Sequence, residues 1–547
     1  MRGQWRLVTI SSVLYAGHQG TEALVPVLIG VVIDDAVATG SGGALLRWIG
    51  VLAAVFLVLS MCFRFGARTG ERASYQAGHA LRLQLTERVL DHRGGAEANR
   101  LSGALVNIAT DDAKRVGAVN LALPIGIAAL SGLVVGGVVL LSMSLTLGLL
   151  VLLGIPLLLW AAHLLGKPLE RRSHAEQERA AHASGVATDL VGGLRVLKGI
   201  GAAPAAIARY RRTSQNSLAA TLRAARAEAW HDGAMLVLTG LVVAVIALVG
   251  GRLAAQGEIS VGNLVAAVGL AQFLLGPLTI FAWVNGQLAQ GRASAARIAS
   301  VLAAPYSVPP GTAALPESVA GRLRLHAVSH AALRQVDVDV APGELIGVVS
   351  TDPGAATALL ECLGRETDPA TGSLSLDGVP LDTLNPDELR TAVLVAAHDA
   401  DLFEESLIDN VRAGRDGDVR PALSAAAADE VAETLPDGVR TVLAERGRSL
   451  SGGQRQRAAL ARALAANPPV LVVHDPTTAV DAMTEARIAA GIRATRDGRT
   501  TVLVTTSPAL LAVTDRVVLL DGGAISAEGE HADLVHGNER YRTTVLA

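Results

Sequence analysis

Six long apolar stretches in the first half of the chain set the strongest limit on its fold. They cover residues 7–33, 45–65, 121–141, 145–165, 234–249 and 261–284. A helix needs about 20 apolar residues to cross the hydrocarbon core of a bilayer. The chain of 547 residues is 50% hydrophobic with a mean hydropathy of +0.40, which is too apolar for a soluble protein of that size. We therefore predict a multi-domain chain in which an all-α transmembrane domain of six spans is joined to a soluble part.

The first apolar stretch has two interpretations. Residues 1–20 carry positive charge followed by apolar residues, as a secretory signal does. The apolar character continues to Ile33, which favours a first transmembrane span over a cleaved signal.

The connections between the stretches are of two kinds. Residues 34–44, 142–144 and 250–260 are short and poor in Lys and Arg, whereas the others are long and basic. Residues 73–91 and 169–190 are charged, amphipathic and free of proline, which predicts helices that extend beyond the membrane. Because basic connections tend to stay in the cytoplasm, we expect the long connections and both termini to be cytoplasmic, at the plasma membrane.

Charge and cysteine content exclude several function classes. The formal net charge of −3 gives no global field that would attract nucleic acid. Cys62 and Cys362 lie far apart and offer neither a disulfide framework nor a metal-ligand spacing. We therefore expect no redox chemistry and no metal centre built by this chain alone.

A proline-rich segment predicts a domain boundary. Proline removes backbone donors and breaks periodicity, and four prolines occur between Ala303 and Gly321. Beyond this segment, two runs alternate like antiparallel strands, whereas residues 345–349, 470–473 and 501–506 are continuous apolar runs typical of buried parallel strands. We predict a transmembrane domain over 1–303, a linker over 304–321 and an α/β domain over 322–547.

One short motif in the second domain is highly specific in this context. The sequence LSGGQ is formed by Leu450, Ser451, Gly452, Gly453 and Gln454. It stands at the start of a predicted helix that Pro468 and Pro469 end. The free N–H groups and the dipole at a helix start attract an anion such as a phosphate group.

LSGGQ is similar to the signature of ATP-binding-cassette (ABC) transporters. Over essentially its whole length the chain resembles a half-transporter of the exporter fold, with six spans, cytoplasmic stalks and one P-loop-type nucleotide-binding domain. The resemblance implies ATP with Mg²⁺ as cofactor, and two nucleotide-binding domains that face each other head to tail. Ser451, Gly453 and Gln454 would then serve the nucleotide of the opposite domain, as would Asp481 at the position that crosses to the partner.

The chain's own phosphate-binding loop departs from the family pattern. A P-loop requires glycines for backbone wrapping, a lysine for the phosphates and a hydroxyl for magnesium. Where GxxGxGKST is expected, the chain reads STDPGAATA. Ser350, Pro353, Ala355 and Ala356 replace the three glycines and the lysine, and only Thr357 keeps a hydroxyl. Losing the charged donor alone costs about 1.5–3 kcal/mol of phosphate binding.

Other positions of this site depart in the same direction. His474 and Asp475 replace the family's Asp-Glu pair, and imidazole is a poor ligand for Mg²⁺. Asp475 is one methylene shorter than the glutamate that polarises the attacking water. The remaining departures are His398 at the Q-loop glutamine, Thr506 at the switch histidine, and Ala331 or Ala332 near the adenine-stacking aromatic. We predict that this chain's own site is catalytically inactive.

The resemblance also indicates where the stalks turn. Exporters place short coupling helices that touch the nucleotide-binding domains at positions corresponding to Asp111 and Asp112 with Lys114 and Arg115, and to residues 201–210. A solvated turn would have the same composition.

A few polar side chains lie within the predicted spans. His18 and Glu22 are one helical turn apart, and ionisable groups at membrane depth are candidates for a substrate pathway. Trp283 and Asn285, with Gln272 and Gln287, are further candidates. Mutual pairing and interhelical packing explain these residues equally well.

The retained LSGGQ beside a degenerate site favours a heterodimer with a second half-transporter of consensus motifs. This chain would complete that partner's ATP site, and the pair would export a lipophilic compound or peptide. Two alternatives remain open: an importer of exporter-like fold with a siderophore-type substrate, and a non-transporting membrane scaffold or regulator.

Overall fold

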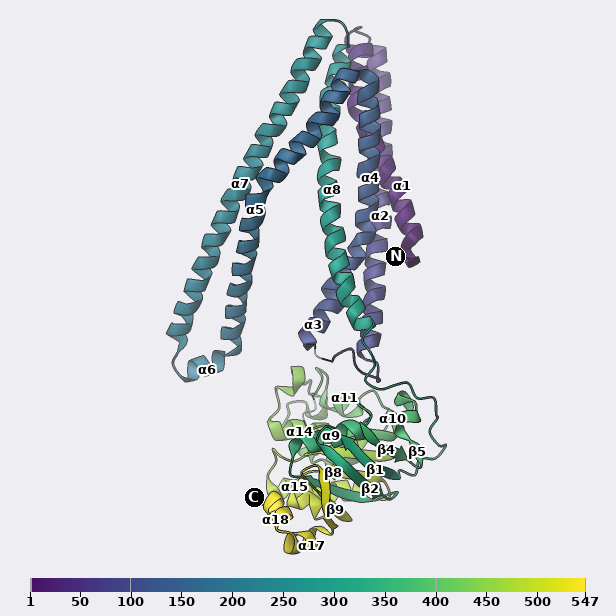
Figure 1. Cartoon of the computed structure of the whole chain (residues 1–547), viewed down its shortest axis with the longest axis vertical. Coiled ribbons are helices and arrows are strands. Elements are labelled where there is room, and N and C mark those ends of the chain that lie inside the picture. Colours follow the sequence, from purple (N-terminus) through teal and green to yellow (C-terminus); the bar gives the residue numbers. More distant parts are fainter. Residues whose placement is uncertain (1, 99, 399–400, 547) are drawn as a thin grey trace. The chain divides into compact units, whose positions relative to one another are not determined.

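The computed structural model describes residues 2–98, 100–398 and 401–546. These residues form two compact units. One unit comprises residues up to Leu85 together with Gly103–Ser300, and the other comprises Thr86–Ser102 and the chain from Val301 onward. The first unit is helical and the second is α/β (Figure 1). The predicted fold class is therefore confirmed.

The first unit is built from very long helices. α7, of 53 residues, is about 80 Å long at ~1.5 Å per residue, more than twice the ~30 Å core of a bilayer. Five of the six predicted spans fall in one long helix that continues past the span, so the predicted helical extensions are confirmed. The first predicted span, 7–33, ends one residue beyond its helix. The helices are α1 Trp5–Val32, α2 Gly42–Val89, α3 Ser102–Asn107, α4 Ala113–Met143, α5 Leu145–Gly192, α6 Leu194–Gly199, α7 Ala203–Ala255 and α8 Val261–Leu302, with short 3-10 or π turns at Arg2–Gln4, Ile33–Val37 and Ile108–Asp112.

Among the described residues, five helices are long and apolar enough to cross a membrane: α2, the continuous helix Ser102–Met143, α5, α7 and α8. The chain is therefore a membrane protein. The structure forms the remaining predicted span, 7–33, as helix α1, but this helix does not reach the same apolar composition. His18, Gln19 and Glu22 interrupt its apolar run.

Helix pairs hold the first unit together. α5 and α7 run side by side down to the short helix α6, and α1 packs along α4 (Figure 1). A buried apolar core that includes Leu140, Leu147 and Leu270 joins α4, α5 and α8. At one end of α1, the Asp34 carboxylate accepts a hydrogen bond from the Gly262 amide at 2.9 Å and so caps the start of α8.

The first stalk turn lies N-terminal to its predicted place. The chain reverses between Val89 and Ser102, whereas Asp111 and Asp112 lie within the continuous helix Ser102–Met143. Asp112 is 1% exposed and accepts hydrogen bonds from Arg297 Nε at 2.7 Å and Ser294 Oγ at 2.8 Å. Its carboxylate joins this helix to α8, whereas Asp111, Lys114 and Arg115 are exposed on the helix.

The second stalk turn is displaced in the same direction. The short helix there is α6, Leu194–Gly199, and most of the predicted segment 201–210 belongs to α7. Gly201 supplies a left-handed turn residue with φ +66°, and a proline in the first turn of α7 fixes the helix start. The glycines and the proline, rather than the charges, determine where these stalks reverse.

The second unit contains two sheets. A six-stranded sheet has the order β10-β9-β3-β8-β7-β6, in which only β10 is antiparallel to its neighbour. An antiparallel sheet has the order β2-β1-β4-β5. The strands are β1 Leu323–His330, β2 Leu333–Val340, β3 Leu345–Ser350, β4 Thr371–Leu376, β5 Val379–Pro380, β6 Val393–Ala396, β7 Val470–His474, β8 Thr500–Val504, β9 Arg516–Asp521 and β10 Ala524–Gly529.

Burial explains the two kinds of strand. β3, β7 and β8 are buried almost along their whole length, because the antiparallel sheet and several helices pack on the two faces of the six-stranded sheet. The helices of this unit are α9 Pro353–Leu363, α10 Pro386–Ala392, α11 Leu407–Arg412, α12 Arg420–Ala425, α13 Ala428–Glu433, α14 Gly452–Ala466, α15 Ala482–Thr495, α16 Pro508–Leu511, α17 His531–Gly537 and α18 Glu539–Leu546, with short 3-10 turns at Leu381–Thr383, Gly438–Arg440 and Glu445–Gly447.

The segment after α2 is fastened to the start of the linker. The Tyr306 ring lies between two guanidinium groups, with the Arg88 carbon at 4.1 Å and the Arg93 carbon at 3.7 Å from its centroid. Arg88 also donates to the Ala304 carbonyl at 2.9 Å. Cation–π contacts of this kind stabilise by about 0.5–1 kcal/mol at exposed sites and more when desolvated. The chain that follows α2 is thus held by the chain that follows α8.

We expect Gly95→Ala to destabilise this contact strongly. Gly95 has φ +89°, and a Cβ there would lie 2.1 Å from the Pro305 carbonyl oxygen. Left-handed strain and overpacking together cost about 3 kcal/mol. Thermal unfolding of the detergent-solubilised chain measures the loss. Gly103→Ala is the control, because nothing lies within 4 Å of its added Cβ. Equal melting temperatures for the two variants would contradict the expectation.

Candidate functional site

The chain's own P-loop position lies between β3 and α9. Ser350 ends the strand, and α9 begins at Pro353 with Asp352 as its N-cap. Ala355 and Ala356 are buried in the core of the domain. The only retained hydroxyl, on Thr357, donates to the Pro353 carbonyl at 3.1 Å. No ammonium group stands at the lysine position, so these residues do not fit the phosphates of Mg·ATP.

Two histidines lie close together at the end of β7. The ring centroids of His398 and His474 are 6.0 Å apart. His398 Nδ1 lies 3.3 Å from the Asp475 carbonyl oxygen, and His474 Nε2 lies 3.6 Å from the Asp475 carboxylate. The structure therefore brings together three of the degenerate positions. Asp475 has φ +42°, a left-handed conformation that aspartate adopts more readily than most residues.

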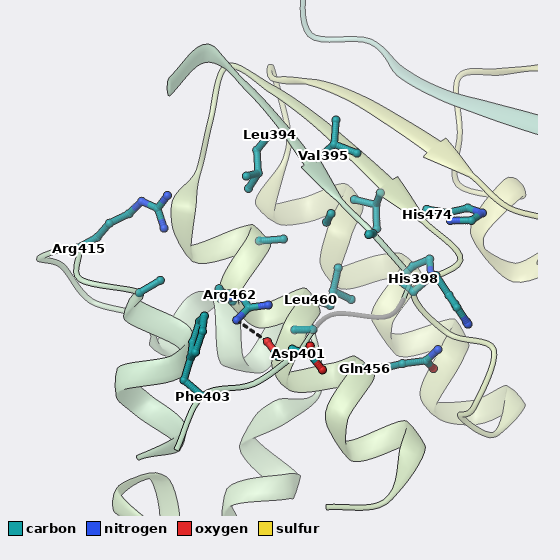
Figure 2. A pocket seen from close by; sticks show the side chains of 17 residues that line it. Leu394, Val395, His398, Asp401, Phe403, Arg415, Gln456, Leu460, Arg462 and His474 are labelled. Carbon is teal, nitrogen blue, oxygen red and sulfur yellow. Dashed lines mark hydrogen bonds between the residues drawn. The ribbon is translucent and has the colours of Figure 1, made fainter. Parts of the chain in front are cut away.

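The same histidines line an open cleft of about 470 Å³. Figure 2 shows both imidazoles at one end of the cleft, and Phe403 and Arg415 at the other. Arg462 donates to the Asp401 carbonyl at 3.0 Å on its floor. Within the described residues, no group of three His, Cys, Asp or Glu side chains is placed to hold a metal ion. The hard oxygen ligands that Mg²⁺ prefers are not gathered in this part of the chain.

The remaining degenerate positions lie at strand ends. Ala331 and Ala332 form the turn between β1 and β2, where a stacking aromatic was expected. Thr506 follows β8 and is exposed, while its neighbour Ser507 caps α16. None of these side chains can stack on a base or act as an imidazole donor.

The LSGGQ residues form a complete helix start. Ser451 is the N-cap of α14, and its hydroxyl accepts from the Gln454 amide at 3.3 Å. The Gln454 side chain accepts in return from the Ser451 amide at 2.8 Å. This reciprocal capping box fixes the first turn, while Leu450 and Gly453 are buried beneath it. Gly452 lies in the exposed first turn, so the positive end of the helix dipole is open to an anion from outside the chain.

Asp481 lies at the start of the next long helix, α15. It is the N-cap of α15 and accepts from the amides of Met483 at 3.1 Å and Thr484 at 3.0 Å. Hydrogen bonds from the Thr484 amide and hydroxyl lower the pKa of the Asp481 carboxyl below its ordinary value. A second oxygen of this carboxylate accepts from the Thr484 hydroxyl at 2.8 Å. The local role of Asp481 is therefore helix capping.

Sequence reasoning missed two residues of this region. Gln456 donates to the Thr478 hydroxyl at 2.7 Å and accepts from the Ala479 amide at 2.9 Å, so it fastens α14 to the loop before Asp481. Asp352 was not singled out, although an Asp-Pro pair before a helical run is a recognised start signal. No sequence signal identifies Gln456, because its partners lie more than 20 positions away.

The polar residues of the membrane helices divide into two groups. His18 Nδ1 lies 3.0 Å from the Leu59 carbonyl oxygen, and His18 Nε2 lies 3.7 Å from Glu22. Trp283 and Asn285 are exposed on α8. The structure thus pairs His18 with Glu22 on the same helix. Cys362 is buried, which raises the pKa of its thiol to about 11 and keeps it protonated.

Known proteins resemble both units. Residues 8–278 match the ABC transporter transmembrane region, and residues 333–478 match the ABC transporter domain. The chain is 31% identical over 531 residues to a multidrug efflux ATP-binding/permease protein of Mycobacterium bovis, covering 95% of this chain and 44% of the relative. It therefore spans less than half the length of that relative.

Two further relatives are closer to this chain in length. The chain is 30% identical over 387 residues to an ATP-dependent lipid A-core flippase of Thiobacillus denitrificans, covering 69% of this chain and 67% of the flippase. A solved structure of a bacterial Atm1-family ABC exporter with ATP bound superposes with a TM-score of 0.79 and 22% identity, covering 98% of both chains. That structure shows the fold. On the family matches and the flippase similarity together, the chain belongs to the ABC transporter family.

Proposed function

We propose that this chain is one half of a heterodimeric, ATP-driven exporter in which it completes the partner's ATP site and does not hydrolyse ATP at its own. The observation that carries the proposal is the contrast within one domain. The helix start at Ser451 is intact, capped and open to an outside anion, whereas the loop at Ala356 has no cation and the pair at His474 and Asp475 has no magnesium ligand set.

The partner would supply its own P-loop, magnesium aspartate, catalytic glutamate and switch histidine. This chain would supply Ser451, Gly453 and Gln454 to the γ-phosphate and Asp481 across the interface. Both α14 and α9 contact β6, but α14 packs in one apolar core with α11, α12 and α13, whereas α9 packs in another with β2 and β3. The two helix starts thus belong to different parts of the domain, which suits a site completed by a second domain.

ATP held between the two domains would close them, and hydrolysis would reset them. The α2, α5 and α7 extensions would carry this movement to the membrane. We place both termini and the α/β domain in the cytoplasm and the helices in the plasma membrane, with residues 304–321 as the linker. The names of the relatives, a multidrug efflux protein and a lipid A-core flippase, support a lipophilic substrate. His18, Glu22, Trp283 and Asn285 remain candidates for its path.

We expect the purified chain alone to release no phosphate from ATP, because its P-loop position has no lysine and because His474 and Asp475 stand in place of the magnesium aspartate and the catalytic glutamate. Co-expression with a half-transporter that carries GxxGxGKST and an Asp-Glu pair should give turnover. Phosphate release in detergent micelles measures both. Asp475→Asn is the control for contaminating activity, and it should match the wild-type chain alone. A wild-type rate clearly above that of Asp475→Asn would show that the chain's own site hydrolyses ATP.

A further inference from the structure

The backbone amides of the P-loop position are already satisfied within the chain. In a working P-loop these N–H groups converge on phosphate. Here the Gly354 amide donates to the Asp352 carboxylate at 2.9 Å. The amides of Ala355 and Ala356 donate to the Asp352 carbonyl at 3.0 and 3.2 Å. One residue thus takes three of the donors that a nucleotide would need.

The amides of the residues just before α9 also donate to oxygen atoms of this chain. The Asp352 amide donates to the Ser350 hydroxyl at 3.3 Å, and that hydroxyl donates to the Asp352 carbonyl at 2.7 Å. The Thr351 amide donates to the Leu520 carbonyl at 3.0 Å, and its hydroxyl donates to Asp521 at 2.8 Å. Pro353 has no amide hydrogen. Every N–H from Thr351 to Ala356 is therefore bonded to this chain's own oxygen atoms.

The Asp352 carboxylate is an anion at a helix start. Such a position is where the helix dipole favours a phosphate group. A phosphate that entered would displace this carboxylate from the Gly354 amide and would then lie beside a like charge. With no lysine at position 356 to offset the repulsion, the carboxylate has the advantage of being covalently attached, which gives it a high effective concentration.

The turn where an adenine-stacking side chain was expected packs closely against its neighbours. A Cβ on Gly523 would lie 1.9 Å from the Ala332 carbonyl oxygen, and a Cβ on Gly354 would lie 3.7 Å from the Ala332 methyl group. The turn between β1 and β2 therefore rests directly against the start of α9. The phosphate end thus has its amides bonded within the chain, and the base end has no aromatic side chain at Ala331 or Ala332.

We propose that Asp352 is an internal substitute for phosphate, and that this chain's own site binds no nucleotide at all. The consequence for the complex rests on the proposed function: the heterodimer would bind one ATP rather than two. Closure of the two domains would then be asymmetric. ATP would be bound at the interface that contains Ser451, whereas at the other interface the Asp352 carboxylate would occupy the start of α9.

The test uses the full chain alone in detergent micelles, with the fluorescent nucleotide MANT-ATP and magnesium. We expect no saturable binding by the wild type at millimolar nucleotide. Saturable binding, with photo-crosslinking of 8-azido-ATP to the peptide that contains residues 350–357, would overturn the proposal. The measurement needs no partner. Loss of hydrolysis by the complex would therefore count against the proposed function and leave this inference standing.

Two variants distinguish the effect of the Asp352 carboxylate on nucleotide binding from the effect of the missing lysine. Ala356→Lys restores the cation but leaves Asp352 to pair with it, so this variant should bind little nucleotide. In the double variant Asp352→Gly with Ala356→Lys, the amides are released, and glycine remains a tolerated N-cap. We expect the double variant to bind MANT-ATP at least about tenfold more tightly, a difference of ~1.4 kcal/mol. Equal affinity of the two variants for MANT-ATP would show that Asp352 does not block nucleotide binding, and would overturn the proposal.

Discussion

Replacing Ser451 with alanine is expected to lower ATP turnover by the complex about 100-fold or more. In the proposed complex the Ser451 hydroxyl, at the exposed start of α14, would donate to the γ-phosphate of the partner's ATP. Removing one preorganised donor to a developing charge typically costs ~10²–10³ in rate. The measurement is phosphate release by the purified complex at saturating ATP. The same substitution in the chain alone should change nothing measurable, because that chain is expected to be inactive.

A loss of stability must be distinguished from this effect. Ser451→Ala also removes the N-cap of α14, which costs ~1 kcal/mol. Ser451→Asp keeps a capping oxygen but places a negative charge against the phosphate, so it should be equally inactive and as stable as the wild type. Ser424→Ala, at an exposed position of α12, is the matched serine control with full turnover. Full turnover by Ser451→Ala would favour the scaffold alternative.

The sequence predicted the fold correctly where the evidence is a local pattern of apolar residues. The runs at 345–349 and 470–473 are continuous and apolar, and both form buried parallel strands. A run of this kind can be satisfied only inside a sheet covered on both faces. The apolar stretches gave the helices for the same reason, since length and composition decide which helices can cross a bilayer.

The stalk turns were harder to predict, because their positions were taken from the resemblance to exporters and not from the residues themselves. Asp112 has the composition of a solvated residue, yet its ion pair with Arg297 buries it in a helix. The partner is 185 positions away, so no local pattern reveals the pairing. The short helix α6 stands between glycines that lie before the expected segment 201–210 or at its first residue.

The candidate site also has features that the sequence predicted and features that it could not predict. Motif spacing identified Ser350, Ala356 and His474 as departures from the family pattern. It did not show that the amides beside them are occupied, because hydrogen-bond satisfaction depends on where Asp352 and Leu520 lie in space. The Gly-Gly pair in LSGGQ was assigned to phosphate binding. A further reason for one of the two glycines is the packing of α14 against the loop that leads to Asp481.

Gly453→Ala is expected to destabilise the α/β domain, whereas Gly452→Ala is not. A Cβ on Gly453 would lie 2.4 Å from the Ala479 carbonyl oxygen. That carbonyl cannot easily retreat, because Gln456 holds the same loop through hydrogen bonds to Thr478 and Ala479. Overpacking of this kind costs about 1–3 kcal/mol, and the forced shift would move Asp481 as well. Thermal unfolding of this chain alone measures the stability.

The neighbouring glycine is the matched control. A Cβ on Gly452 would meet the Ala479 methyl group at 3.6 Å, an ordinary van der Waals contact. Alanine also has a higher helix propensity than glycine by ~1 kcal/mol, so Gly452→Ala should melt at the same temperature as the wild type or higher. If the two variants melted together, Gly453 would not be required for close packing. Its presence in the motif would then depend on phosphate binding alone, and the link between α14 and the Asp481 loop would rest on Gln456.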